Sequence, residues 1–232
     1  MNELCKSATV VRQAVSAEDL ALINSHTLRE LTAEEVFVFR IAACDDQIDR
    51  DGERFTLQAL QQMSKLLVGR PMLLDHNWSA SAQTARIYAG GVEATEDRSR
   101  LVLRAYIPRL ESSAAVIDAI ETGILKEVSV GVGVRQVICS ICGEDLYRCS
   151  HIKGRDYDGE VCVGVLDNVE DAYEVSLVAV PAQPAAAVFK RRGVKEGNPS
   201  PSDRADMSED SKLRMAQALQ AQEEYRYGGM KQ

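Results

Sequence analysis

The alternation of valine in the segment KEVSVGVGV is the strongest constraint on the fold. Because side chains of a β-strand point alternately to its two faces, every second residue here is predicted to face a core. These residues are Val128, Val130, Val132 and Val134. Other runs with strand character are EVFVFRIAAC, PMLLDHNW, ARIYAGGVEAT, RLVLRAYI and AYEVSLVAVP. Their spacing indicates an α+β chain that is mainly β, with antiparallel strands in a barrel or sandwich and a few helices.

Three helices are predicted within residues 1–189. From Thr56 to Leu67, apolar residues recur at helical spacing, and Gly69 suits a C-terminal cap. The segment ESSAAVIDAIETG is predicted to be a second helix that ends at its glycine. A shorter helix should begin after Ser16, which would cap it, with Asp19 completing a capping box.

Composition divides the chain into four segments. Residues 1–32 are polar and form an N-terminal extension, whereas residues 33–189 carry nearly all the strand signals and should be the main domain. Residues 190–207 are rich in Lys, Gly, Pro and Ser, which is typical of a flexible linker. Residues 208–232 are helix-prone but have few apolar residues, so a tail helix is predicted there.

The charge and hydropathy of the chain disfavour two classes of partner. The net charge is −8, so the surface should repel a phosphate backbone, and nucleic acid is not expected as a partner. No apolar run approaches the roughly 20 residues needed to span a bilayer, so no membrane partner is expected either. The sequence therefore predicts a soluble, intracellular protein.

His76 is the best candidate for a catalytic base. The chain has three histidines, and His26 lies in the extension while His151 belongs to a cysteine cluster. His76 follows a short apolar strand, where a side chain can emerge at the strand end. The alternative is an ordinary turn histidine.

Ser129 is the candidate nucleophile. It lies on the strand face opposite the valines, together with Gly131 and Gly133, and this face should leave room for a substrate backbone. Serine needs a base within hydrogen-bond reach, and His76 is the best available. The alternative is a half-buried edge strand with a small polar face.

A third group is needed to orient the imidazole. Glu174 shares a strand face with Ser176, and it could supply a carboxylate for this purpose. Its alternative role is a solvated strand carboxylate. Ser176 is a rival nucleophile that the pattern does not exclude.

Four motifs in this order resemble the prohead proteases of tailed phages, which mature the capsid. They are DGERF, GRPMLLDHN, KEVSVGVGV and EVSLVAVPAQPAA, and the resemblance spans residues 34–188. The family is similar in fold to the herpesvirus assemblins, which implies an antiparallel β-barrel with surrounding helices. The resemblance implies that His76 is the base, Ser129 the nucleophile and Glu174 the third member. Assemblins use a second histidine as third member, but none is spare here.

The same resemblance implies a serine endopeptidase of a phage or prophage. It would cleave scaffold and capsid proteins inside an assembling procapsid in the host cytoplasm, and also its own tail near the linker. A second copy of the chain is a further candidate partner. Two positions depart from the family pattern: the order around the base is Asp75, His76, Asn77 instead of Asn-His-Asp, and no aromatic residue follows Gly131.

A cysteine-rich insertion at about residues 137–163 predicts a zinc site. Two cysteines in a CxxCG turn and a CxH pair supply the four ligands that tetrahedral zinc prefers. The predicted ligands are Cys139, Cys142, Cys149 and His151, with Cys162 as an alternative to His151. Four protein ligands leave no open position for a catalytic water, so the zinc should be structural. Disulfides or a redox CxxC are the alternatives, and a reducing compartment disfavours disulfides.

Two other functions compete with the peptidase. One is a non-catalytic capsid-assembly or scaffold module, in which the zinc knot is a docking element. The other is a zinc-dependent nucleic-acid binder, which the acidic charge and the aromatic content of only 5% disfavour.

Overall fold

The structure is a computed structural model that describes residues 15–183 and 185–189. The predicted linker at 190–207 and tail helix at 208–232 lie outside these residues, as does most of the first half of the extension. Among the described helices, none is long and apolar enough to cross a membrane.

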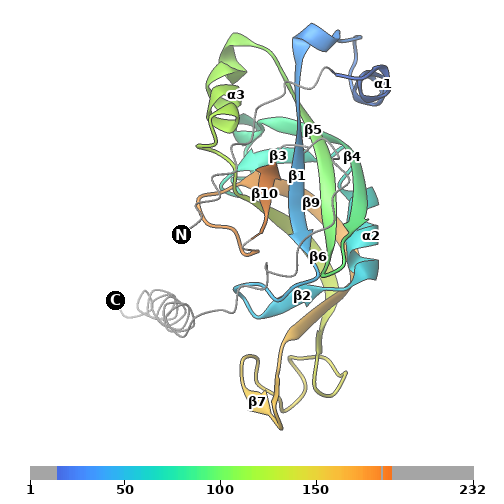
Figure 1. Cartoon of the computed structure of the whole chain (residues 1–232), viewed down its shortest axis with the longest axis vertical. Coiled ribbons are helices and arrows are strands. Elements are labelled where there is room, and N and C mark those ends of the chain that lie inside the picture. The colour runs from blue at the N-terminus through green and yellow to red at the C-terminus, as the bar shows by residue number, and fades with distance from the viewer. Residues whose placement is uncertain (1–14, 184, 190–232) are drawn as a thin grey trace, which may run out of the picture. The chain divides into compact units, whose positions relative to one another are not determined.

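The described part is α+β and mainly strands, as predicted (Figure 1). Its α-helices are α1 (Ala17–Asn24), α2 (Leu57–Leu66) and α3 (Ala114–Glu121), and short 3₁₀ turns occupy Ala33–Glu35, Ala80–Ala82 and Glu111–Ser113. The strands of the first half are β1 (Val36–Asp45), β2 (Glu53–Phe55), β3 (Pro71–Leu74), β4 (Ala85–Ala94) and β5 (Ser99–Pro108). Those of the second half are β6 (Val128–Cys139), β7 (Asp156–Tyr157), β8 (Glu160–Val161), β9 (Gly164–Leu177) and β10 (Ala187–Phe189).

The main sheet has eight strands and is mixed, so the predicted antiparallel arrangement is only partly right. Its order is β10-β1-β5-β4-β3-β9-β2, and β6 pairs with β9 along its length. Both β2 and β3 run parallel to β9, because helix α2 between them returns the chain to the same direction. β7 and β8 form a separate two-stranded sheet.

The predicted barrel is wrong, because the sheet does not close. Closure would need β6 to pair with β1, but β10 comes between their ends. β10 has three residues and pairs with β1, while it reaches the start of β6 through one isolated bridge, Glu127 to Ala187. Beyond that bridge the sheet stays open between β6 and β1.

Helix α2 covers the sheet as its sequence predicts. Thr56 caps it by accepting a hydrogen bond from the Ala59 N–H at 3.1 Å, and its apolar stripe is fully buried at Leu60 and Met63. At Gly90 of β4, a Cβ would lie 2.4 Å from the Ser64 carbonyl oxygen. Glycine therefore allows the helix to lie directly on the sheet.

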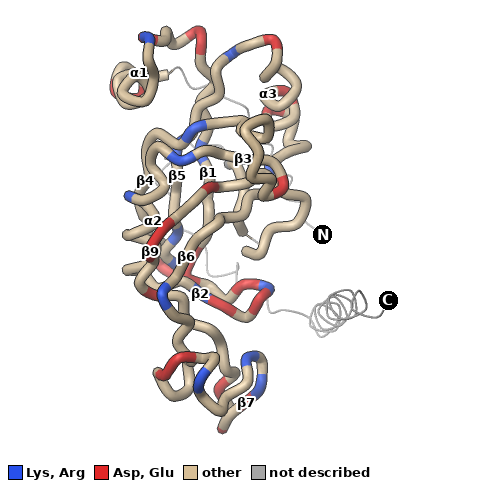
Figure 2. The backbone as a smooth tube through the Cα atoms, turned by 180° about the vertical axis from the view of Figure 1, so that it is seen from behind, with Lys and Arg blue, Asp and Glu red and all other residues tan. Residues whose placement is uncertain are grey.

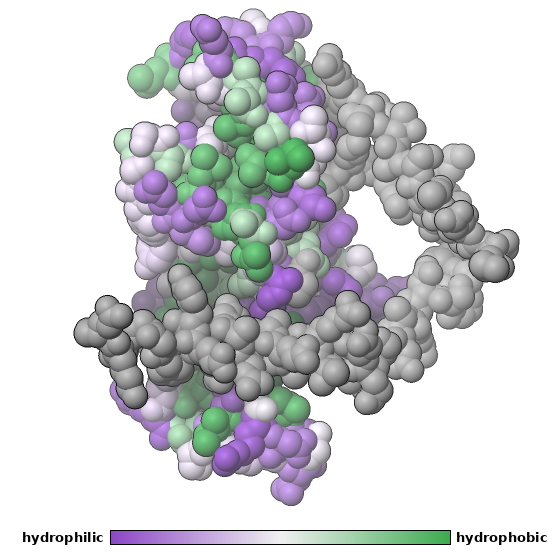
Figure 3. Space-filling view, turned by 90° about the vertical axis from the view of Figure 1, so that its left-hand side faces the viewer, coloured by the Kyte–Doolittle hydropathy of each residue, from purple (hydrophilic) through white to green (hydrophobic). Residues whose placement is uncertain are grey.

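The second half of the extension packs on the domain. Ser16 caps α1 by accepting a hydrogen bond from the Asp19 N–H, and the Asp19 carboxylate pairs with Arg104 and Tyr88 on the sheet. Ile23 of α1 is fully buried. Elsewhere on the described part, apolar residues also reach the surface, as the green patch in Figure 3 shows.

Candidate functional site

The His76 turn is held against the end of β9. β3 is in register with β9, and the Asp75 N–H continues this pairing by donating to the Leu177 carbonyl at 3.0 Å. Asp75 and His76 then adopt left-handed backbone conformations, with φ of 51° and 53°. Such conformations cost roughly 1–3 kcal/mol each for non-glycine residues, so hydrogen bonds around the turn must hold them. One is the bond from the His76 N–H to the Ser176 hydroxyl, at 3.0 Å.

Glu174 orients the His76 ring. Its side chain is 1% exposed, so it is buried and not solvated, and its Oε1 lies 2.7 Å from His76 Nδ1. Its Oε2 accepts a hydrogen bond from the Ser176 hydroxyl at 2.6 Å. A carboxylate on Nδ1 fixes this nitrogen as the donor and leaves Nε2 to accept a proton. The His76 side chain is 41% exposed, so this second nitrogen can meet a substrate.

Ser129 lies beside this pair. It is half-buried and stands directly opposite Ser176 in the β6–β9 register. Facing residues of an antiparallel pair have Cβ atoms about 4.5–5.5 Å apart, so both hydroxyls lie on the same face. The structure brings His76 and Glu174 into contact, but it shows no hydrogen bond between His76 and Ser129, both of which it describes.

The glycine face of β6 is occupied, contrary to the expectation that it would admit a substrate. A Cβ on Gly131 would lie 2.4 Å from Glu174 Oε1, and a Cβ on Gly133 would lie 2.6 Å from the Tyr173 hydroxyl oxygen. The register shifts here, so that Tyr173 is an extra residue of β9. This bulge lets the consecutive residues Tyr173 and Glu174 both reach over the glycines. The glycines therefore make room for the protein's own side chains.

Replacing Gly131 by Ala tests this packing. We expect the free energy of unfolding to fall by about 1–3 kcal/mol, because the new methyl group overlaps the Glu174 carboxylate. Gly91→Ala is the matched control, since a Cβ there meets no described atom within 4 Å. Denaturant unfolding of both variants measures the difference. Equal stability of the two variants would contradict the assigned position of Glu174.

An aromatic pair stands next to the His76 turn. The rings of Trp78 and Tyr173 have centroids 5.6 Å apart, and their residues are 70% and 38% exposed. Tyr173 reaches this position because it is the extra residue of the bulge in β9, and sequence periodicity does not reveal a bulge. Trp78 is the single tryptophan of the chain, so its fluorescence reports directly on this site.

A groove runs along the open edge of β6. Its volume is ≈ 150 Å³, and its walls come from β6, the end of β1, the turn before β2 and the loop before β10. The residues that line it include Ser129, Val130, Val132, Ala43, Asp49 and Gln183. The Val128 N–H donates to the Ala186 carbonyl, so by alternation the main-chain groups of Val130 and Val132 point into the groove.

The start of β2 and the turn before it make the acidic wall of this groove. The segment at β2 carries acidic positions in Figure 2, and Asp49, Asp51 and Glu53 line the groove. Asp49 is buried, and burial raises the pKa of its carboxyl group. Its Oδ1 accepts hydrogen bonds from the backbone N–H groups of Asp51 and Glu53, so this carboxylate shapes the turn.

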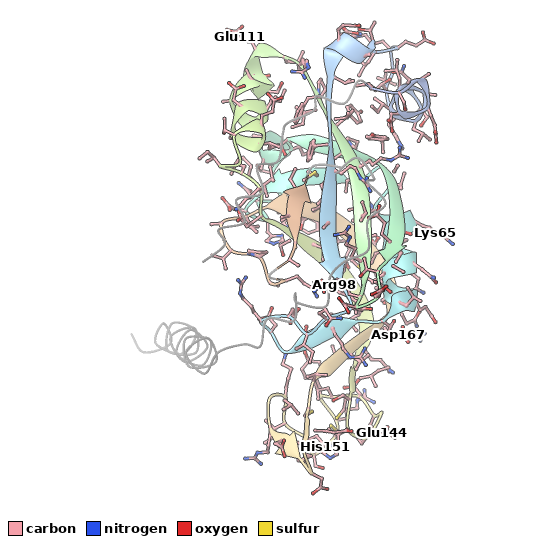
Figure 4. All side chains as sticks on the ribbon, viewed as in Figure 1. Lys65, Arg98, Glu111, Glu144, His151 and Asp167 are labelled. Atoms are coloured by element: carbon pink, nitrogen blue, oxygen red, sulfur yellow. The ribbon has the colours of Figure 1, made fainter. Side chains whose placement is uncertain are left out.

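The four predicted metal ligands converge beyond the end of the β6–β9 pair, where Figure 4 labels His151. The ligand atoms of Cys139, Cys142, Cys149 and His151 all lie within 4.8 Å of one another. His151 Nδ1 is buried and makes no hydrogen bond to a described residue, as expected of a nitrogen that binds a metal. This cluster could hold a metal such as zinc.

The pKa values of the thiols in and beside the cluster are shifted in opposite directions. Burial alone would raise the pKa of Cys139, but hydrogen bonds from the backbone N–H groups of Cys142 and Ile141 and from Cys162 lower it to about 6. Cys162 lies beside the cluster, with its Sγ 3.7 Å from that of Cys139. Burial raises the pKa of Cys162 to about 11. The cysteines of the described part are free thiols, and the alternative of a disulfide is not observed among them.

The cysteine knot, defined as residues 139–163, contacts the acidic wall of the groove. Lys153 pairs with Glu53 at 2.7 Å, and its aliphatic stem lies against Gly52. The Gly164 N–H donates to the Gly52 carbonyl at 3.0 Å. The same short turn thus contacts the knot on one side and lines the groove on the other.

In comparisons with protein-family models, curated proteins and solved structures, no match to this chain was found. The site is therefore defined by its own geometry: the buried Glu174 carboxylate contacts the half-exposed His76 beside Ser129 of β6, and a Cys3His cluster lies beyond the ends of β6 and β9.

Proposed function

We propose that this chain is a serine endopeptidase in which His76 is the base, Ser129 the nucleophile and Glu174 the orienting carboxylate. The observation that carries the proposal is the contact between the buried Glu174 carboxylate and His76 Nδ1. Few structural roles need a buried carboxylate to hold a half-exposed imidazole beside a serine. The motif resemblance supports the same assignment of residues.

The reaction follows from this arrangement. His76 Nε2 takes the proton of the Ser129 hydroxyl as its oxygen attacks the scissile carbonyl carbon. The carboxylate of Glu174 stabilises the resulting imidazolium, which then gives its proton to the leaving amine as the C–N bond breaks. A water molecule, deprotonated by the same imidazole, hydrolyses the acyl-enzyme. The His76–Ser129 hydrogen bond forms on substrate binding, since such bonds are often long before a substrate is present.

The groove beside Ser129 supports a peptide as the substrate. Main-chain groups of Val130 and Val132 face it without a neighbouring described strand, and an extended peptide can pair with such an edge. Peptide pairing there would bring a scissile bond alongside Ser129. Side-chain selection would come from the groove walls.

The cysteine knot has a structural role in this proposal. Zinc suits the ligand set, and it would be held by Cys139, Cys142, Cys149 and His151. Bound by four protein ligands, the ion contributes folding free energy and no open coordination position. The knot residues themselves then hold the ends of β6 and β9 together.

The substrates that we propose are the scaffold and capsid proteins of a phage or prophage procapsid, in the host cytoplasm. The sequence resemblance carries this part. Confinement within a procapsid raises the effective concentration of substrate, so modest intrinsic activity suffices. The chain's own tail beyond residue 190 is a further substrate, and a second copy is a further partner.

A specific observation favours a second function, the non-catalytic assembly module. Three large apolar side chains on the knot are exposed: Tyr147 at 79%, Ile152 at 55% and Val161 at 54%. Exposed apolar residues on a small knot suit docking to another protein. In that case the knot is the functional surface, and Ser129 is dispensable.

The intact mass of the purified chain separates the two functions. We expect the wild type to lose part of its tail and to cleave co-expressed capsid protein, while Ser129→Ala keeps its full mass and leaves the capsid protein whole. Cleavage that persists in Ser129→Ala would remove Ser129 from the mechanism. A full-length wild type with uncut capsid protein that it nevertheless binds would favour the assembly module.

A further inference from the structure

One hydroxyl group contacts both the side chain of Glu174 and the backbone of His76 in the proposed site. Ser176 is fully buried, and its Oγ donates to Glu174 Oε2 at 2.6 Å. The same oxygen accepts a hydrogen bond from the His76 N–H at 3.0 Å. Since the other carboxylate oxygen contacts His76 Nδ1, the three residues form a closed ring of hydrogen bonds.

We propose that Ser176 is a positioning residue, which fixes both the carboxylate of Glu174 and the backbone of the His76 turn. Its catalytic consequence rests on the proposed peptidase function, but the hydrogen-bond ring does not. A serine hydroxyl has one proton, and that of Ser176 is donated to Glu174. Ser176 therefore has no proton to offer His76, and its burial keeps it from a substrate.

The ring explains how the left-handed turn persists. His76 has a φ of 53°, and its backbone N–H is fixed by the Ser176 hydroxyl. Without that hydroxyl, a buried carboxylate oxygen and a backbone N–H both lose a hydrogen bond, which is unfavourable for each group. The turn could then relax, and the imidazole would leave the geometry that Glu174 imposes.

The position of Ser176 in the strand makes this arrangement possible. Residues two apart in a strand share a face, so Ser176 and Glu174 project together toward the His76 turn. β3 lies beside this part of β9, with Leu73 in register with Ser176. A hydroxyl at this point reaches both the carboxylate and the chain that leaves β3.

The test compares three variants by the NMR signal of the proton on His76 Nδ1. A hydrogen bond to a carboxylate shifts this signal strongly downfield and protects the proton from exchange. The signal is assigned by its loss in His76→Gln. We expect Ser176→Ala to lose it and Ser176→Thr, which keeps the hydroxyl, to retain it. Val175→Ala is the matched control, because Val175 is also fully buried on β9 but lies on its other face.

Kinetics on a capsid-protein substrate provide the second measurement. Ser176→Ala should lower kcat by roughly 10- to 100-fold with KM little changed, since the loss is in the geometry of the base and not in substrate binding. Ser176→Thr should recover most of that loss. Val175→Ala should keep both the signal and kcat within about threefold, even where it lowers the melting temperature.

Three results would overturn the role of Ser176. They are a retained resonance and kcat in Ser176→Ala, an equal loss in Ser176→Thr, or an equal loss in Val175→Ala, which would show general destabilisation. The resonance is measured without substrate. A wild type that shows the resonance but cleaves nothing would therefore refute the peptidase function and leave the positioning role decided by the variants.

Discussion

Ser129→Ala and His76→Ala are each expected to lower the rate of capsid-protein cleavage by a factor on the order of 10³ to 10⁶, and the double variant should be no slower than either. The reason is that each proton transfer by the imidazole serves the attack of Ser129 or the turnover of the acyl-enzyme that Ser129 forms, so removing either group removes the whole pathway. Single-turnover cleavage of a purified capsid-protein fragment gives the three rates. Binding of the fragment, followed by Trp78 fluorescence, should persist in all three variants.

Two control variants separate this loss from a general effect. Ser79→Ala changes a half-buried serine one residue after Trp78, and His26→Ala changes an exposed histidine of the extension. Both should cleave at the wild-type rate. Losses that multiply in the Ser129, His76 double variant would place the two residues in separate steps and contradict the proposed mechanism.

Removal of the metal is expected to unfold the cysteine knot while the sheet persists. Zinc in a four-ligand protein site contributes folding free energy on the order of 10 kcal/mol, and a knot of this size has little core of its own. Cys142 is an exposed member of the cluster. The Cys142→Ser variant should bind no zinc, and its backbone amides at residues 139–163 should lose their protection from hydrogen exchange. Metal analysis and hydrogen exchange measure both effects, and a chelator should reproduce them on the wild type.

Substitutions at Cys44, Cys162 and His151 provide a control and identify the fourth metal ligand. Cys44→Ala is the control, because Cys44 is buried in β1 away from the cluster and should not affect the metal content. Cys162→Ser should keep the metal, whereas His151→Ala should lose it. The reverse pattern would make Cys162 the fourth ligand. Protection of residues 139–163 without any metal would contradict the structural role of zinc.

Local signals in the sequence predicted most of the elements. The valine alternation located β6, and all four valines pack on the core. Thr56 and the apolar spacing after it located α2, because caps and periodicity act within a few residues. The convergence of Cys139, Cys142, Cys149 and His151 in a cluster that could hold a metal is predictable for the same reason, since the spacing of such residues within a short loop is a local property.

Non-local pairing was not predictable in this way. The parallel pairing of β2 and β3 with β9, and the open gap beside β6, depend on strands distant in sequence. Glycine has no side chain, so the sequence alone predicts that the glycine face of β6 is open. A register shift in β9 instead places Tyr173 and Glu174 there, and a bulge leaves no periodic signal in a single sequence.

The paired left-handed residues Asp75 and His76 imply a trade-off between stability and activity at this one turn. Among the described non-glycine residues, Asp158 and Asn168 also have positive φ, but each stands alone, so substitutions that relieve the paired residues of this turn would raise stability most. Glycine at position 75 or 76 is the obvious relief. At position 75 it would loosen the chain that carries the imidazole, and at position 76 it would remove the imidazole itself. Stabilising the protein at this turn would therefore lower its proposed catalytic activity.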